Sequence, residues 1–199
     1  MHRKLIAILV LALVVTTAQA EKKKGLSIGD KAPTFTNLPG TDGKSYSSSD
    51  FKDKDVLVIC ITCNHCPVAV AYEDRIIDFT KKWATGDDSK VALVAVNVNV
   101  NNQDKLDKMK LRSKEKGFNF TYLYDESQKL GRQLGARVTP EFFVFNKKRE
   151  LVYHGAMDNK MRNPTENYLI AAVKATVAGK KPEKQQTRPV GCGVQYKRN

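Results

Sequence analysis

The sequence has little that would hold it in a membrane or on a nucleic acid. After residue 20, no apolar run approaches the roughly 20 residues that a membrane-spanning helix needs. The formal net charge is +13, but the basic runs at 21–24, at 105–116 and in the tail contain almost no aromatic side chains. Nucleic-acid-binding surfaces interleave aromatic and basic residues. We therefore predict solvated basic surfaces and expect no nucleic-acid partner.

Cysteine is also scarce, with four residues in the chain: Cys60, Cys63, Cys66 and Cys192. Cys63 and Cys66 are separated by only two residues, and a bridge that closes so short a loop constrains the unfolded chain little. Redox chemistry is therefore a better reason for this spacing than stability. Cys60 lies in an apolar run and is expected to be a buried, inert core residue. Cys192 stays open as a resolving thiol, an intermolecular link or a structural partner.

Residues 1–20 have the three parts of a secretory signal. A basic start with Arg3 and Lys4 is followed by an apolar stretch at 5–15 and by the small-x-small sequence Ala18-Gln19-Ala20. We predict cleavage after Ala20 and export to the periplasm or the medium, with no membrane span in the mature chain. The charge then falls to +11. What remains fits one domain over 21–179, followed by a basic tail over 180–199.

The hydrophobic pattern predicts strands that alternate with helices. Buried strands are expected at 55–62 and 91–96, and a short extended piece at 118–123. Helices are expected from Pro67 to about Trp83, at 105–116, at 128–134 and, last, from Pro164 to Gly179. An antiparallel hairpin pattern spans 141–146 and 150–154. This order indicates an α/β fold with a central mixed sheet flanked by helices.

Within the expected helices, a few apolar positions are predicted to face inward. They are Val68, Tyr72, Ile76, Phe79 and Trp83 of the first, Leu106, Met109 and Leu111 of the second, and Leu169, Val173 and Val177 of the last.

The segment Cys63-Asn64-His65-Cys66-Pro67 lies at the junction of the first buried strand and the first helix. Proline is favoured at the first helical position, which would make Cys66 the N-cap residue. The positive end of the helix dipole favours thiolate over thiol, so we predict a lowered thiol pKa here. His65 can stabilise the Cys63 thiolate by charge or by a hydrogen bond, and Asn64 is grouped with it as a tuning residue.

Five segments carry a resemblance to a known family: Ile28–Pro33, Cys63–Pro67, Ala71–Ile76, Gly135–Glu141 and the tail from Arg188 to Cys192. With them, the sequence resembles the thioredoxin superfamily. Within it, the chain is similar to the redoxin branch, the alkyl hydroperoxide reductase/thiol-specific antioxidant group, and its peroxiredoxin-like proteins with a thioredoxin-style Cys-x-x-Cys. The resemblance implies a thioredoxin-like fold with an N-terminal redoxin-type extension. It also implies a cis Pro140 that faces the sulfurs and leaves Val138 and Thr139 to bind an extended substrate chain.

The resemblance allows two reaction schemes. In the thioredoxin-like scheme an exposed Cys63 is the nucleophile and Cys66 resolves the mixed disulfide. In the peroxiredoxin-like scheme Cys66 attacks a peroxide and Cys63 resolves the sulfenic acid. The peroxidase pattern has a proline, a threonine or serine and an arginine where this chain has Ile59, Cys63 and Pro140, although Arg137 is close by. Because the donors that polarise the O–O bond are missing, we favour thiol–disulfide exchange without a cofactor.

A third interpretation is a non-enzymatic binding module or a metal-binding protein. The run Cys60-x-x-Cys63-x-x-Cys66 is superficially similar to an iron–sulfur motif. A strand that leads into a helix would separate these ligands, so no metal site is predicted. The expected partners are a redox partner protein and protein or peroxide substrates.

Overall fold

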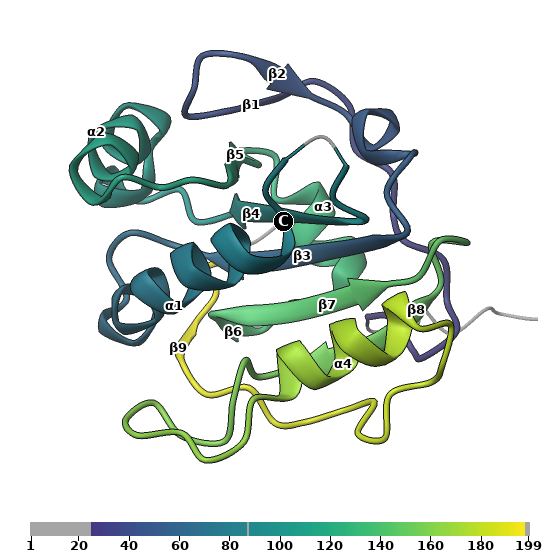
Figure 1. The fold of residues 1–199 in the computed structure, drawn as a ribbon. Coiled ribbons are helices and arrows are strands. Elements are labelled where there is room, and N and C mark those ends of the chain that lie inside the picture. Colours follow the sequence, from purple (N-terminus) through teal and green to yellow (C-terminus); the bar gives the residue numbers. More distant parts are fainter. Residues whose placement is uncertain (1–24, 87, 198–199) are drawn as a thin grey trace, which may run out of the picture.

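The computed structural model describes residues 25–86 and 88–197. The predicted signal segment at 1–20 lies outside this range. A central five-stranded sheet has helices on both faces, which confirms the predicted α/β class (Figure 1). The sheet order is β5-β4-β3-β7-β8. The bounds are β3 (Val56–Thr62), β4 (Val91–Asn97), β5 (Thr121–Tyr124), β7 (Glu141–Phe145) and β8 (Leu151–Gly155).

The sheet is mixed, as the alternation of elements followed by a hairpin predicts. β3 pairs in parallel with β4, and β4 with β5. β7 runs antiparallel to both β3 and β8. Every residue of β3 and of β4 is buried, because helices cover both faces of these near-continuous β-branched runs.

The two faces of the sheet bury separate clusters. On one face lie α1 (Pro67–Trp83), α4 (Tyr168–Val177) and Met109 of α2 (Leu106–Lys116). On the other lie α3 (Lys129–Leu134) and Phe51 of the short helix η1 (Ser48–Phe51). The strands β1 (Leu38–Pro39) and β2 (Ser45–Tyr46) precede η1 in the N-terminal segment.

The last helix begins later than predicted, at Tyr168 rather than Pro164. Two side chains explain the shift. The Asn159 Oδ1 atom accepts hydrogen bonds from the backbone N–H groups of Thr165 and Glu166 and holds them in a loop. The Asn167 side chain then accepts from the Ile170 N–H at 2.9 Å and caps the helix.

Two residues predicted to face inward are exposed. Leu111 is 61% exposed, because it lies two positions, roughly 200° around the helix, from the buried Met109. Val177 is 36% exposed and is the last residue of α4. The inward positions Tyr72, Ile76 and Phe79 of α1 are buried, as predicted.

The C-terminal tail folds back along the domain. Its strand β9 (Cys192–Gly193) pairs antiparallel with β6 (Val138–Thr139), the strand that precedes Pro140. Figure 1 shows this segment in yellow, returning from α4 toward the start of α1. Within residues 25–86 and 88–197, no helix has the length and apolarity needed to cross a bilayer.

Candidate active site

The register of the two central strands brings two loops together. β3 and β4 are parallel, with Thr62 opposite Asn97. The segments that follow them therefore emerge at the same edge of the sheet, where α/β proteins commonly bind ligands. One segment carries Cys63 to Cys66, and the other contains the short helix η2 (Asn102–Asp104).

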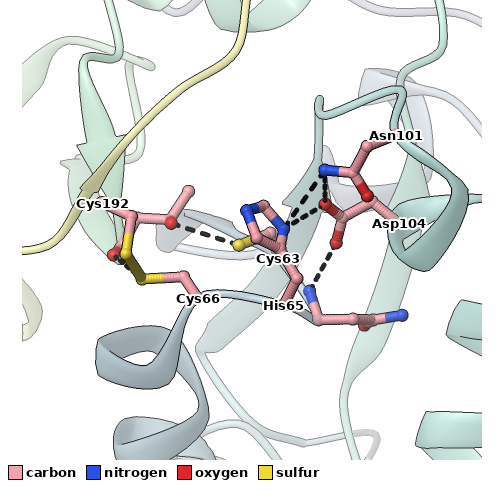
Figure 2. Close-up of a disulfide and its surroundings, with 8 residues drawn as sticks. Cys63, His65, Cys66, Asn101, Asp104 and Cys192 are labelled. Atoms are coloured by element: carbon pink, nitrogen blue, oxygen red, sulfur yellow. Dashed lines mark hydrogen bonds and ion pairs between the residues drawn. A yellow bond between two sulfur atoms is a disulfide. The ribbon is translucent and has the colours of Figure 1, made fainter.

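The disulfide in the structure joins Cys66 to Cys192 (Figure 2). Their Cα atoms are 5.9 Å apart, and 126 positions separate them in the sequence. Cys66 is the N-cap residue of α1 and Pro67 is its first residue, as predicted. Cys63 carries a free thiol, so in this structure the bridge does not lie within the Cys-x-x-Cys motif. Of the three roles left open for Cys192, the structure shows a partner within the same chain.

Thr139 contacts or pairs with all three cysteines of the site. Its Oγ1 atom lies 3.2 Å from the Cys63 sulfur, and its carbonyl oxygen lies 3.4 Å from the Cys66 sulfur. Its backbone pairs with Cys192. The Thr139–Pro140 peptide bond is cis, which agrees with the resemblance. The edge predicted to hold a substrate, Val138 and Thr139, is thus occupied by the chain's own tail.

The three cysteines of the site differ in how far each residue is exposed to solvent. Cys63 is 3% exposed and Cys66 is fully buried, whereas Cys192 is partly exposed. The predicted exposed position of Cys63 is therefore wrong for this form of the protein, because the thiol packs against Cys66, Ala69 and Cys192. Cys60 is fully buried in the core, as predicted.

Burial raises the pKa of the Cys63 thiol, and the charge of Asp104 raises it further. The Thr139 hydroxyl and the backbone N–H groups of His65 and Cys66 act in the opposite direction but are outweighed. The predicted lowering of the pKa by the helix dipole is thus not met here, because desolvation of a buried sulfur disfavours the thiolate. Burial also raises the pKa of the Cys60 thiol, which keeps it neutral.

Asp104 organises the loop between the two cysteines. Its side chain is fully buried, and one carboxylate oxygen accepts a hydrogen bond from the Asn64 backbone N–H at 2.7 Å. The other oxygen contacts His65 Nδ1 and accepts from the Asn101 side-chain amide at 2.7 Å. These contacts, shown in Figure 2, fix the orientation of the imidazole ring.

Asn64, predicted as a tuning residue, anchors the same loop. Its amide donates to the Gln103 carbonyl at 3.0 Å, and its side-chain oxygen accepts from the Tyr122 hydroxyl at 3.0 Å. We therefore assign to Asn64 the positioning of the motif, and to His65 the contact with the Asp104 carboxylate.

Cys63, His65 and Asp104 form a compact group. The Cys63 sulfur, a ring nitrogen of His65 and a carboxylate oxygen of Asp104 lie within 4.8 Å of one another. Sulfur, nitrogen and oxygen atoms at this spacing could bind a metal ion such as zinc. They could equally pass a proton from the thiol to an imidazole that a carboxylate orients. The second chemistry fits better, because the carboxylate already contacts four donors, from Asn64, His65, Asn97 and Asn101.

A second buried carboxylate supports the segment before Pro140. Glu141 accepts hydrogen bonds from the backbone N–H groups of Arg137 at 2.6 Å and Val138 at 3.2 Å. Its other oxygen lies 2.6 Å from His154 Nε2, and the His154 ring stacks on Phe143 at 4.5 Å between centroids. This pair holds β6 in place beside the sulfurs.

Sequence reasoning missed Asp104, Asn101, Glu141 and His154 as parts of the site. A signal existed for the first two, because the polar segment after β4 must meet the segment after β3 if the strands are parallel. Glu141 and His154 lie on adjacent hairpin strands, and their pairing depends on a register that the sequence leaves open.

Comparison with known proteins identifies the family and structures with a similar fold. The Redoxin family model matches residues 27–169, whereas no curated protein matches the chain. A hypothetical protein from Sinorhizobium meliloti 1021 is 30% identical, with a TM-score of 0.80 over 88% of this chain and 97% of that one. An uncharacterized conserved protein from Geobacillus kaustophilus is 28% identical, with a TM-score of 0.79 over 87% and 94%.

A further neighbour shares the fold at lower identity. A protein described as the thiol:disulfide interchange protein DsbE from Chlorobium tepidum is 23% identical, with a TM-score of 0.55 over 65% of this chain and 85% of that one. Together with the Cys66–Cys192 bond, the family match supports a redox enzyme that acts through thiols. The chain belongs to the Redoxin family, with a thioredoxin-like fold.

Proposed function

We propose that the protein is an extracytoplasmic thiol–disulfide oxidoreductase in which Cys63 and Cys66 form the reactive dithiol. The observation that carries the proposal is the arrangement around Thr139, which contacts the free Cys63 thiol and the disulfide-bonded Cys66 sulfur. A thiol beside a disulfide is the minimal arrangement for exchange, which proceeds by attack of a thiolate on a disulfide sulfur.

The reaction begins from the form in which both Cys63 and Cys66 are reduced. His65, which Asp104 holds, takes the Cys63 proton through a bridging water, since the sulfur and the ring nitrogen lie within 4.8 Å of each other. The Cys63 thiolate attacks one sulfur of the substrate disulfide and forms a mixed disulfide, and the first substrate thiolate leaves. Cys66 then attacks the Cys63 sulfur, the Cys63–Cys66 bond forms, and the second substrate thiolate leaves. The Thr139 hydroxyl, 3.2 Å from the Cys63 sulfur, stabilises the thiolate.

Reduction of insulin disulfides with a thiol donor tests this assignment. Cys63→Ser and Cys66→Ser should each abolish turnover, because either change removes one of the two sulfurs that carry the electron pair. Cys60→Ala is the matched control, because Cys60 is fully buried in the main core cluster and not in the cluster that contains Cys63 and Cys66. Wild-type turnover in Cys63→Ser would refute the assignment.

A second candidate, reduction of peroxides by Cys66, is favoured by the identity of the disulfide. A Cys66 thiolate that attacks a hydroperoxide becomes a sulfenic acid and releases an alcohol; attack by the Cys192 thiol then releases water and leaves the observed bond. Against it, Cys66 is fully buried, and Ile59 occupies a position where the peroxidase pattern has proline. Hydroperoxide consumption that is lost in Cys66→Ser but kept in Cys63→Ser would select this alternative.

The extracytoplasmic location rests on the sequence of residues 1–20 and on the disulfide, which persists in oxidising compartments. Expression of the full chain followed by fractionation should recover a mature protein that begins at Glu21 outside the cytoplasm. Recovery of the unprocessed chain in the cytoplasm would contradict the location.

A further inference from the structure

The tail that carries Cys192 is held by non-covalent contacts on both sides of the cysteine. Before it, Thr187 donates its N–H to the His154 carbonyl at 3.1 Å and accepts from the Ala156 N–H at 2.9 Å. After it, three backbone N–H groups are bonded to the body of the domain: Val194 to the Arg137 carbonyl at 2.9 Å, Gln195 to Asn99 Oδ1 at 2.9 Å and Lys197 to Gln128 Oε1 at 2.8 Å.

These contacts do not depend on the bond between the sulfurs. When the disulfide opens, they keep the Cys192 thiol beside Cys66, where its effective concentration stays high. Cys192 is also the most exposed cysteine of the site: the residue is partly exposed, whereas Cys63 is 3% exposed and Cys66 is fully buried. A soluble thiol therefore meets Cys192 before it meets either cysteine of the motif.

We propose that Cys192 is a third redox residue, through which an external thiol donor regenerates the Cys63–Cys66 dithiol. The proposal rests on the proposed function and adds the route by which electrons return. Substrate exchange uses Cys63, donor exchange uses Cys192, and Cys66 bonds with each in turn. The observed state, with the Cys66–Cys192 bond and a free Cys63 thiol, is then the intermediate that awaits the donor.

Each step balances. After substrate reduction has left a Cys63–Cys66 bond, the Cys192 thiolate attacks the Cys66 sulfur. The Cys66–Cys192 bond forms, the Cys63–Cys66 bond breaks, and the electron pair leaves on Cys63, which regains a proton from His65. A donor thiolate then attacks Cys192 and forms a mixed disulfide, with Cys66 leaving as a thiolate at the N-terminus of α1. A second donor thiolate attacks the donor sulfur of this mixed disulfide. The donor disulfide forms, and Cys192 leaves as a thiolate that takes up a proton.

Two glycines that flank Cys192 provide a matched test. A Cβ atom on Gly191 would lie 2.0 Å from the Thr139 carbonyl oxygen, so Gly191→Ala must push β9 away from β6 while all four thiols remain. A Cβ atom on Gly193 meets nothing within 4 Å, so Gly193→Ala should leave the pairing intact. Cys192→Ser removes the thiol itself.

The assay separates substrate reduction from regeneration. Reduced protein is first mixed with one equivalent of a disulfide-bonded peptide, and turnover is then measured with reduced glutathione as donor. We expect wild-type, Cys192→Ser and Gly191→Ala proteins to reduce the peptide once at similar rates. With glutathione, Cys192→Ser and Gly191→Ala should have turnover rates at least about tenfold below the wild-type rate, because the donor must reach a buried sulfur. Gly193→Ala should match the wild type.

Mass spectrometry of the wild-type protein stopped during turnover should find glutathione on Cys192. Turnover of Cys192→Ser at the wild-type rate, or glutathione found on Cys66 instead, would overturn the proposal even if single-turnover reduction is intact. Failure of the wild-type protein to reduce the peptide once would instead refute the proposed function, so the two failures are distinguishable.

Discussion

Removal of the Asp104 carboxylate should both lower the stability of the protein and slow disulfide reduction by Cys63. In Asp104→Ala, the donors that lose their acceptor are the Asn64 N–H, the side-chain amides of Asn97 and Asn101, and the His65 ring. A hydrogen bond to a charged group contributes roughly 1.5–3 kcal/mol. Water that enters the space recovers part of this, so we expect a loss of about 3–5 kcal/mol in the free energy of unfolding.

The loss is large enough to measure and small enough to leave a folded protein, since single domains are stable by about 5–15 kcal/mol. For a chain of this size it corresponds to a fall in Tm of about 6–20 °C. Urea unfolding and calorimetry measure both quantities. Asp107→Ala is the control, because the Asp107 side chain is 67% exposed on α2 and forms a long ion pair with Lys108 at 3.7 Å, so it should change stability by less than about 1 kcal/mol.

The Asp104→Asn variant distinguishes a role of Asp104 in orienting His65 from a role in packing alone. The amide keeps the shape of the side chain but removes the charge that holds His65, so disulfide reduction should fall by about tenfold or more. The charge of Asp104 also raises the pKa of Cys63, so the alkylation midpoint of this thiol should move to lower pH even as turnover falls. A purely structural residue would not separate these two readouts. Wild-type stability in Asp104→Ala, together with wild-type turnover in Asp104→Asn, would refute the role given to this carboxylate.

Three further predictions follow from single groups. Burial raises the pKa of Cys63, so its alkylation in the Cys66–Cys192 form should rise with pH through a midpoint above the ordinary thiol value of about 8.5; a midpoint at or below that value would contradict the buried position. Cys60→Ala should lower the free energy of unfolding by about 1 kcal/mol and leave turnover unchanged, because it removes only a buried sulfur; lost turnover would show that this thiol takes part. Glu141→Gln should lower stability by about 1–3 kcal/mol in urea unfolding, because the contacts to His154 and to the β6 backbone lose their charge; an unchanged midpoint would contradict that support.

The local sequence pattern was sufficient to predict elements whose residues all lie in the same kind of environment. The run at 55–62 predicts β3 because every position from Val56 to Thr62 is apolar or β-branched and both faces are covered. Pro67 predicts the start of α1 because proline fits the first helical position. The same reasoning predicted a helix start at Pro164, which is wrong, because the Asn159 side chain holds the residues after Pro164 in a loop. A side chain that competes for backbone groups can thus shift a helix start that propensity alone suggests.

The sulfur chemistry depended on long-range structure that local pattern does not encode. The motif predicted the position of Cys66 at the helix N-terminus, but the partner of Cys66 lies 126 residues away in a tail that folds back onto β6. The dipole of the helix next to Cys63 favours the thiolate, but the desolvation that β9 and the neighbouring side chains impose outweighs it. Burial of a thiol is a property of the packed fold.

A thiol count tests most directly whether Cys66 takes part in the exchange. The fully reduced protein is mixed anaerobically with one equivalent of a disulfide-bonded peptide, free thiols are alkylated after an acid quench, and each cysteine is quantified by peptide mapping. We expect that two thiols are lost per chain, that Cys66 is always one of them, and that Cys60 stays free. Retention of the Cys66 thiol, with the peptide disulfide intact, would contradict this expectation.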